Sequence, residues 1–229
     1  MPPSVWGAQG WNRGQNMNCS REMMRLYAVT DRSWLNGQTL YEQVEQALKG
    51  GVTLVQLREK GLGAEQFLQE ARQIQQLCRR FGVPLIINDS IEVALAVDAD
   101  GVHLGQDDAN AAQARQLLGK EKIIGVSAHN VQEALQAVQD GADYLGSGAV
   151  FGSGTKTNVS TLPMQTLREI CSAVPIPVVA IGGITEQNLQ QLSGSGIAGA
   201  AVVSAIFAQE NIEEAAIRLR GLLSQMQLD

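Results

Sequence analysis

Residues 98–105 read Asp-Ala-Asp-Gly-Val-His-Leu-Gly, and this arrangement recurs along the chain. A glycine stands directly before a short apolar run here and again within residues 49–55, 140–148 and 195–203. Glycine at the end of a helix accepts the left-handed conformation at little cost, so each stretch is typical of a helix that passes into a strand. The repetition predicts weak internal repeats of one β-α unit.

Eight short runs, four to six residues long and mostly apolar, extend this pattern outward from residue 26. They are continuously apolar rather than alternating, which is typical of buried parallel strands. The expected strands are Leu26–Thr30, Thr53–Leu57, Leu85–Asn88, Gly101–Leu104, Ile123–Val126, Tyr144–Ala149, Val178–Ile181 and Ala200–Val203.

Amphipathic segments with apolar residues at helical spacing separate these runs. The expected helices are Leu40–Lys49, Ala64–Phe81, Ile91–Val97, Ala111–Leu118, Val131–Gln139, Met164–Val174, Glu186–Leu192 and Ile212–Met226.

Eight β-α units in one chain predict an α/β fold, a single-domain (β/α)8 or TIM barrel over residues 26–229. An open doubly wound sheet is the alternative, but it usually carries an early GxGxxG motif, and the sequence has none. Residues 1–25 have no period and are expected to form a poorly ordered N-terminal extension.

Composition narrows the classes of function. The net charge is −6 without a Lys/Arg cluster, which argues against a nucleic-acid partner. No apolar run is long enough for a membrane span, so no membrane partner is expected. The three cysteines form no zinc or disulfide pattern, which favours a reduced, cytoplasmic compartment. The sequence is compatible with a homo-oligomer and does not fix the oligomeric state.

Polar residues end the second expected strand, where a barrel carries its active site. Alternation places Gln56, Arg58 and Lys60 on one side of an extended chain. Arginine binds phosphate oxygens through two N–H groups and lysine as a point charge, so the pattern suits a diphosphate. Ordinary surface charges at a strand end are the alternative.

Carboxylates follow the next two strands, at Asp89 and at Asp107-Asp108. Oxygen ligands beside a diphosphate favour Mg²⁺ as the cofactor. Asp89 could instead cap the following helix, and the other two could be ordinary first-turn acids.

A second anion site is expected across the barrel. Gly182 and Gly183 let backbone N–H groups approach a phosphate, and a helix that begins near Ser204 adds its dipole. Ser127 could donate a hydrogen bond to a ligand. A serine nucleophile would need a base, and neither histidine has an obvious Ser/Asp partner in the sequence, which argues against serine-hydrolase chemistry. His103 is expected to be a satisfied interior histidine and His129 a helix-start residue.

The motifs together resemble the thiamine-phosphate synthase family from about Leu26 to the C-terminus. The matching stretches are LYAVTD (26–31), QLREKG (56–61), IIND (86–89), ADGVHLGQDD (99–108), IIGVSAHN (123–130), GADYLGSGAVFGSGTK (141–156), VVAIGGI (178–184) and AVVSAI (201–206). Family members typically carry Thr-x-Thr-Lys where residues 153–156 read Ser-Gly-Thr-Lys, so the first hydroxyl is kept without its methyl group.

The resemblance implies a role for each matching position. The aminopyrimidine diphosphate would be bound by Gln56, Arg58, Lys60, Asn88, Ser127 and Lys156, and of these Arg58, Lys60, Ser127 and Lys156 would be catalytic. Asp89 and Asp108 would bind Mg²⁺, with Asp107 a neighbour rather than a ligand. The thiazole phosphate would be bound by Ser153, Gly154, Thr155, Gly182, Gly183, Val203 and Ser204.

The implied reaction is a substitution at the pyrimidine methylene. Pyrophosphate leaves first, and the thiazole nitrogen captures the cation that remains, giving thiamine phosphate. A thiazole tautomerase on the same scaffold, another phosphate-sugar barrel such as an epimerase, and a non-catalytic phosphate-binding barrel are the competing hypotheses. The presence of both the cationic and the acidic positions favours the synthase.

Overall fold

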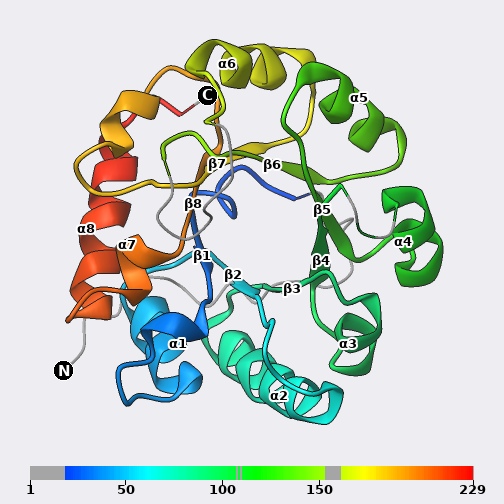
Figure 1. Cartoon of the computed structure of the whole chain (residues 1–229). Helices are drawn as coiled ribbons and strands as arrows, with labels where there is room; N and C mark the ends of the chain where they lie inside the picture. The colour runs from blue at the N-terminus through cyan, green and yellow to red at the C-terminus, as the bar shows by residue number, and fades with distance from the viewer. Residues whose placement is uncertain (1–18, 107, 109, 153–160, 229) are drawn as a thin grey trace.

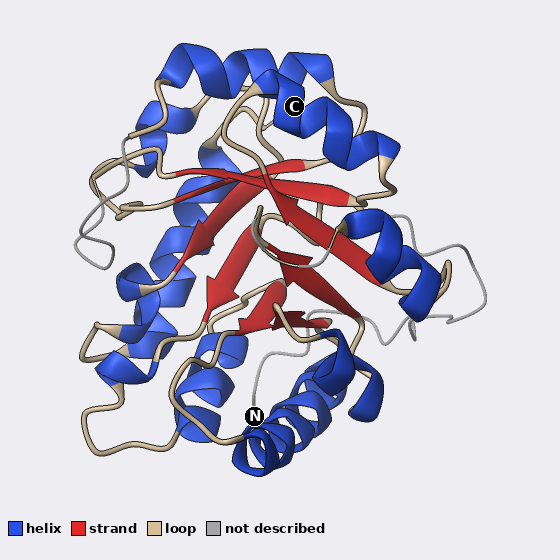
Figure 2. Cartoon of the chain, turned by 45° about the vertical axis from the view of Figure 1, so that its right-hand side comes forward, coloured by secondary structure: helices blue, strands red, loops and turns tan. Residues whose placement is uncertain are grey.

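Eight parallel strands close into a barrel in which every strand pairs with its sequence neighbours and β1 pairs with β8. The structure, a computed structural model, describes residues 19–106, 108, 110–152 and 161–228. Figure 1 looks along the barrel and shows the helices as a ring outside the strands, and Figure 2 shows the strands enclosed between them. The predicted (β/α)8 barrel is confirmed.

Every strand lies within one residue of its predicted limits. The strands are β1 (Leu26–Val29), β2 (Leu54–Leu57), β3 (Leu85–Asn88), β4 (Gly101–Leu104), β5 (Ile123–Ser127), β6 (Tyr144–Gly148), β7 (Val178–Ile181) and β8 (Gly199–Val202). Apart from the half-buried last residues of β3, β5 and β7, the strands are buried throughout. This agrees with the unbroken apolar runs, because helices cover the outer face of the sheet and side chains fill its interior.

The outer ring follows the amphipathic segments closely. Its helices are α1 (Leu40–Lys49), α2 (Ala64–Phe81), α3 (Ile91–Ala96), α4 (Ala111–Leu118), α5 (Val131–Gln139), α6 (Met164–Ala173), α7 (Ser204–Phe207) and α8 (Ile212–Gln225). Side-chain caps fix several starts; Thr39 and Glu42, for example, form a reciprocal capping box at α1. A short 3-10 turn, Arg32–Trp34, follows β1.

The helix predicted at Glu186–Leu192 is wrong. Only a 3-10 turn, Leu189–Leu192, forms there. The Asn188 side chain accepts from the Thr185 N–H at 2.8 Å and donates to the Gly183 carbonyl at 2.8 Å. These bonds fix the backbone after β7 as a turn that leads directly into the 3-10 residues.

The described part of the N-terminal segment belongs to the barrel, so the boundary predicted at residue 26 lies too late. Cys19, Met23 and Met24 are buried among the apolar side chains inside the barrel. Because methionine fills irregular space well, the segment adds to the core in spite of its aperiodic sequence. Residues 1–18 lie outside the described chain.

The barrel interior holds two tyrosines, although aromatic residues make up only 4% of the chain. The rings of Tyr27 and Tyr144 meet edge to face, with centroids 5.9 Å apart. A glycine makes room for them: a Cβ atom at Gly125 would lie 2.1 Å from Cζ of Tyr144. The centre of the barrel is therefore partly polar.

Candidate active site

The predicted pyrimidine-side residues that the structure describes lie at or just after the carboxyl ends of neighbouring strands. Gln56 lies near the end of β2, with Arg58 and Lys60 directly after it, and Asn88 and Ser127 are the last residues of β3 and β5. Parallel strands in a closed barrel end at the same mouth, so the topology gathers these positions at one end of the molecule.

Arg58 is anchored through its backbone to β1. Its N–H donates to Oγ1 of the buried Thr30 at 3.0 Å, and the Thr30 hydroxyl donates to the Arg58 carbonyl at 3.4 Å. The guanidinium Nη1 lies 3.7 Å from Oδ2 of Asp31, and the side chain remains 25% exposed. The cation is thus held at the rim but is still accessible to a ligand.

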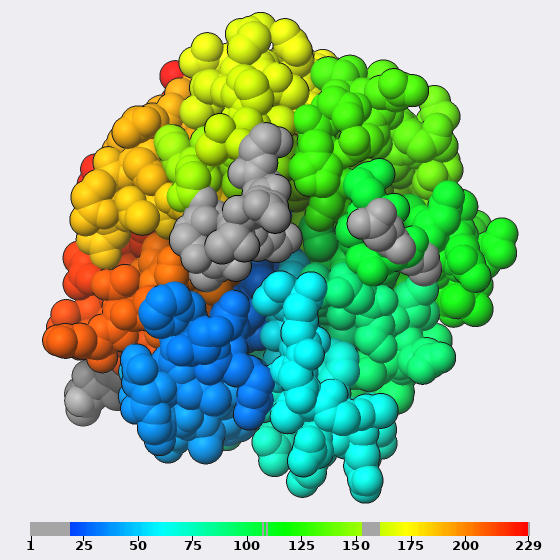
Figure 3. Space-filling model, viewed as in Figure 1, coloured from blue at the N-terminus to red at the C-terminus, as the bar shows by residue number. Residues whose placement is uncertain are grey.

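Glu59, between the two cations, is held apart from them. Its Oε2 lies 3.4 Å from Nη1 of Arg32, and its Oε1 accepts from the Gly61 N–H at 2.8 Å. Figure 3 shows the segments after β1 and β2, in blue and cyan, side by side at this rim. Because Glu59 is paired with Arg32, its charge does not neutralise Arg58 or Lys60 directly.

Asp89 and Asp108 come together from consecutive strand ends. The Asp89 backbone has a left-handed φ of 63°, and its N–H donates to the His103 carbonyl at 2.9 Å. The Asp108 Oδ2 accepts from the Gly105 N–H at 2.6 Å. Burial and the adjacent Asp108 carboxylate raise the pKa of Asp89 to about 6, although Lys60 and Arg58 oppose the shift. The two acids are therefore close enough that Asp108 disfavours the charged form of Asp89.

This carboxylate pair fits Mg²⁺ in chemistry and number. Among the residues that the structure describes, which leave out Asp107, no cluster of three or more His, Cys, Asp or Glu side chains is placed to hold a metal. Mg²⁺ does not need such a cluster, since it commonly binds through one or two carboxylates and completes its shell with water and substrate phosphates. Two adjacent acids beside two cations suit that mode.

Replacing Asp89 by Asn is expected to stabilise the metal-free protein at pH 7.5. Folding raises the pKa of the Asp89 carboxyl group from 3.8 to about 6, so the folded state holds this proton more tightly than the unfolded state. The stability that the bound proton gives to the folded state is lost as the pH rises through 6. Asn carries no charge and tolerates the left-handed backbone. After discounting for solvent exposure, we expect a gain of about 1 kcal/mol, or about 2–4 °C in Tm.

Thermal unfolding in EDTA, at pH 7.5 and again at pH 4.5, measures this effect. The gain should shrink at the lower pH, where the folded wild-type protein holds Asp89 protonated. An Asn variant that melts at or below the wild-type temperature at pH 7.5 would show that the two acids do not repel each other.

The glycine corner after β7 lies against the segment that follows β6. Gly182 and Gly183 have φ angles of 97° and 65°. A Cβ atom at Gly183 would lie 2.5 Å from the Gly152 carbonyl oxygen, and the Phe151 N–H donates to the Gly182 carbonyl at 3.1 Å. The described start of the loop after β6, Phe151 and Gly152, thus packs against the glycine corner after β7, one of the segments predicted to bind the thiazole phosphate.

Val203 and Ser204 follow β8, and a helix begins at Ser204, as predicted, but it is only one turn long. The helix α7 spans only Ser204–Phe207, with Val203 as its N-cap. So short a helix has little macrodipole, so the predicted contribution of a helix dipole to phosphate binding is corrected. What remains is the set of N–H groups in its first turn, which have no acceptor within the helix and could donate to an anion.

Five predicted positions cannot be placed. Ser153, Gly154, Thr155 and Lys156 of the loop after β6, and Asp107 after β4, lie outside the described residues.

Part of a polar network beneath the mouth was not predicted from the sequence. The hydroxyls of Tyr27 and Tyr144 lie 2.7 Å apart, and His103 bonds to both Tyr144 and Ser127. His103 is interior, as predicted, and burial lowers its pKa to about 4, so it is neutral near pH 7. The alternation of side chains along β1 and β6 could have placed both tyrosines inside the barrel.

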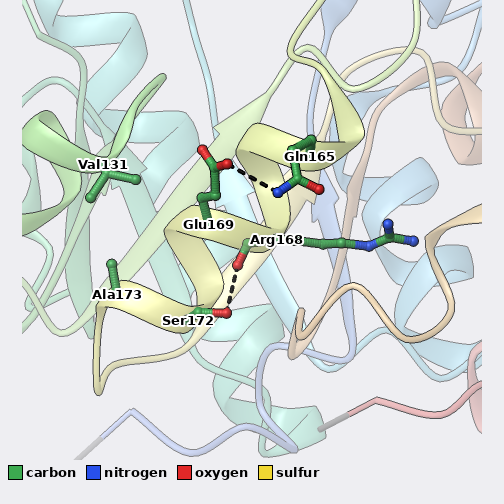
Figure 4. A pocket seen from close by; sticks show the side chains of 6 residues that line it. All are labelled: Val131, Gln165, Arg168, Glu169, Ser172 and Ala173. Carbon is green, nitrogen blue, oxygen red and sulfur yellow. Dashed lines mark hydrogen bonds between the residues drawn. The ribbon is translucent and has the colours of Figure 1, made fainter.

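A shallow hollow between α5 and α6 does not compete with the strand ends. It is lined by Val131, Gln165, Arg168, Glu169, Ser172 and Ala173 (Figure 4). Gln165 Nε2 donates to Glu169 Oε1 at 3.0 Å, and Ser172 donates to the Arg168 carbonyl at 2.8 Å. These polar groups are paired within α6 itself.

The fold and the polar strand ends define a (β/α)8 barrel with a candidate active site at its carboxyl end. The sequence matches the family described as "Thiamine monophosphate synthase" over residues 26–206. The chain therefore belongs to the thiamine-phosphate synthase family.

Individual relatives agree with this membership. The chain is 48% identical to a thiamine-phosphate synthase of Clostridium botulinum over 195 residues, which cover 85% of this chain and 92% of that one. It is 50% identical to one of Chloroflexus aurantiacus over 204 residues, covering 89% and 94%. A solved thiamine phosphate pyrophosphorylase of Pyrococcus furiosus superposes with a TM-score of 0.82 at 36% identity, covering 90% of this chain and 98% of that one.

Proposed function

We propose that the protein joins 4-amino-2-methyl-5-(diphosphooxymethyl)pyrimidine to the thiazole ethyl phosphate, or its carboxylated form, and releases thiamine phosphate and pyrophosphate. The observation that carries the proposal is the convergence of two cations and two carboxylates at one barrel mouth that also holds a glycine corner. Membership of the thiamine-phosphate synthase family supports the same activity.

Arg58 and Lys60 would bind the diphosphate on the β2 side, with Gln56, Asn88 and Ser127 positioning the pyrimidine diphosphate between β2 and β5. Lys156 completes this set as an expectation from the family motif. Asp89 and Asp108 would hold Mg²⁺, which when bound would neutralise charge on the diphosphate, the group that leaves as pyrophosphate. Fixed charges that stabilise a departing pyrophosphate lower the barrier directly.

The second substrate would lie on the opposite side of the mouth. Its phosphate would accept hydrogen bonds from backbone N–H groups around Gly182, Gly183, Val203 and Ser204. Ser153, Gly154 and Thr155 would contact its thiazole ring, as the family motif implies. No protein nucleophile is required, because the thiazole nitrogen forms its bond to the pyrimidine methylene carbon after the C–O bond between that carbon and the departing pyrophosphate has broken.

Replacing Gly183 by Ala is expected to raise the KM for thiazole phosphate about tenfold or more. The methyl group would collide with the Gly152 carbonyl and move the corner away from the phosphate. Gly194→Ala is the matched control, since Gly194 has a φ of 68° and a methyl group added there would have no atom within 4 Å, so only the backbone strain of about 1–2 kcal/mol remains. Equal KM values for the two variants would contradict the placement of the phosphate.

The activity test uses both substrates with Mg²⁺. Thiamine phosphate is followed by oxidation to a fluorescent product and pyrophosphate in parallel. The proposal predicts both products from the complete mixture and neither after EDTA. Conversion of an isolated thiazole tautomer without diphosphate would favour a tautomerase, and binding of the substrates without pyrophosphate release would favour a non-catalytic barrel.

The cytoplasm is the compartment that we propose. Cys19, Cys78 and Cys171 are free thiols, and the first two are buried, which suits a reducing environment. Across the described residues, the helices are too short or too polar to cross a membrane.

A further inference from the structure

One continuous chain of hydrogen bonds crosses the barrel interior from Gln56 to Ser127. Gln56 Nε2 lies 2.6 Å from the Tyr27 hydroxyl, which lies 2.7 Å from the Tyr144 hydroxyl. The Tyr144 hydroxyl lies 2.9 Å from His103 Nδ1, and His103 Nε2 lies 3.1 Å from Ser127 Oγ. Both ends of the chain are residues that the proposed function assigns to the pyrimidine diphosphate.

The middle of this chain is sealed from solvent. Tyr27 and Tyr144 are at most 1% exposed and His103 is 9% exposed, among the side chains of Leu54, Ile86, Ile123 and Val179. A buried hydroxyl proton without an acceptor is costly, so each proton in the chain must point to a neighbour. Counting the protons therefore sets the direction of every bond.

The count begins at Tyr27, whose hydroxyl has one proton. The Gln56 amide donates to the Tyr27 oxygen. If Tyr144 also donated to that oxygen, the Tyr27 proton would have no acceptor among the described residues, because Tyr27 makes side-chain hydrogen bonds to these two partners alone. Tyr27 therefore donates to Tyr144.

The direction then passes through the imidazole. Since the Tyr144 oxygen accepts a hydrogen bond from Tyr27, the Tyr144 hydroxyl donates its own hydrogen bond to His103 Nδ1. His103 is then neutral with its proton on Nε2, from which it donates to Ser127 Oγ. A charged imidazolium would donate to Tyr144 from Nδ1 and would again leave the Tyr27 proton without an acceptor.

Interior glycines make space for this chain. A Cβ atom at Gly125 would overlap Tyr144, and one at Gly146 would lie 3.1 Å from Cε1 of His103. Neither glycine has a left-handed φ, so the sites need a small residue for room rather than for backbone freedom.

We propose that this directed chain makes Ser127 a hydrogen-bond donor toward the diphosphate, with His103 and Tyr144 as positioning residues that act through it. The Ser127 oxygen is occupied by the His103 N–H, so its own proton points outward. Diphosphate oxygens only accept hydrogen bonds, and a serine turned the other way would meet them with a lone pair. The last link, from Ser127 to the substrate, rests on the proposed function, whereas the direction of the chain does not.

The first test is ¹⁵N NMR of the imidazoles in the full-length, substrate-free protein. The chain has two histidines, and His129→Gln assigns the spectrum because His129 is half-exposed and pairs with Glu133 outside this network. We expect His103 to be neutral with its proton on Nε2 at pH 7.5. A proton on Nδ1, or on both nitrogens, would overturn the proposal.

Gln56→Glu tests whether the head of the chain sets its direction. An ionised carboxylate can only accept, so Tyr27 would donate to it, every bond would reverse, and the His103 proton would move to Nδ1. The pH is raised until the ¹³C signal of the introduced carboxyl group shows ionisation. A His103 proton that stays on Nε2 while that carboxyl group is ionised would overturn the proposed coupling.

Kinetics test the functional link. Tyr144→Phe keeps the ring and removes the donor to His103, so we expect kcat to fall about tenfold. Tyr27→Phe, a matched ring in the same core, leaves the Tyr144–His103 bond in place. Because Gln56 loses its hydrogen bond to the Tyr27 hydroxyl, Tyr27→Phe should raise the KM for the pyrimidine diphosphate. We expect kcat to change less than about threefold, roughly the effect of one weak hydrogen bond.

A double-mutant cycle separates positioning from independent effects. If Tyr144 acts through Ser127, Tyr144→Phe should add no further loss of kcat to Ser127→Ala. Losses that multiply would overturn the positioning role. If the tautomer is as expected and the wild-type protein forms no thiamine phosphate, the proposed function fails and the direction of the chain stands.

Discussion

Replacing Asp108 by Asn, or chelating divalent cations, is expected to lower the rate of thiamine phosphate formation about 10²- to 10³-fold. The substitution is nearly isosteric, and Asn can still accept the hydrogen bond from the Gly105 N–H that Asp108 Oδ2 accepts at 2.6 Å. The local backbone should thus be kept while one of two anionic ligands is lost. Initial rates across a range of Mg²⁺ concentrations measure the effect.

Two controls make this result specific to the carboxylate pair. Excess Mg²⁺ should restore the chelated wild-type protein fully and the Asp108→Asn variant only in part. Asp140→Asn removes an acid at the end of α5, which accepts from Gln136 at 3.0 Å, and should leave the rate unchanged. Full activity of Asp108→Asn at low Mg²⁺ would contradict the proposed metal site.

Replacing Arg58 by Gln is expected to lower kcat/KM about 10²- to 10³-fold. The guanidinium lies at the rim with its backbone fixed to Thr30, and it is the described cation best placed to bind two diphosphate oxygens at once. Arg58→Lys should recover part of the loss, because it restores the charge without the planar fork. Steady-state kinetics with the pyrimidine diphosphate as the varied substrate separate the two variants.

The control for Arg58 is an arginine away from the mouth. Arg79, near the end of α2, pairs with Asp98 at 2.7 Å, and Arg79→Gln should not change kcat/KM. An equal loss in Arg58→Gln and Arg79→Gln would point to a general effect of net charge, and full activity of Arg58→Gln would remove Arg58 from the site.

The fold could be predicted from the sequence because its periods are unambiguous. Buried parallel strands give continuous apolar runs such as Leu85–Asn88, and helices that cover them repeat apolar residues at helical spacing. The prediction failed after β7, where the side chain of Asn188 ties the backbone into a turn and only a 3-10 turn follows. Nor could the sequence indicate that Cys19, Met23 and Met24 are buried, because their burial depends on distant strands rather than on a period of their own.

The candidate site could be predicted in part for a related reason. A parallel barrel brings all strand ends to one mouth, so Arg58, Asp89 and Asp108 could be grouped without knowing any distance. The chain of hydrogen bonds from Gln56 to Ser127 could not be predicted in this way. It runs through Tyr27 and Tyr144, whose hydroxyls meet only when β1 and β6 face each other across the closed barrel.

The central claim is that one barrel mouth joins the two substrates, and single-turnover stoichiometry tests it most directly. Protein in excess over the pyrimidine diphosphate is mixed with thiazole phosphate and Mg²⁺, and thiamine phosphate and pyrophosphate are measured in the same quenched samples. The account predicts that both products appear in equal amounts and at the same rate. Absence of thiamine phosphate from folded, Mg²⁺-loaded protein, or pyrophosphate release without it, would contradict the account.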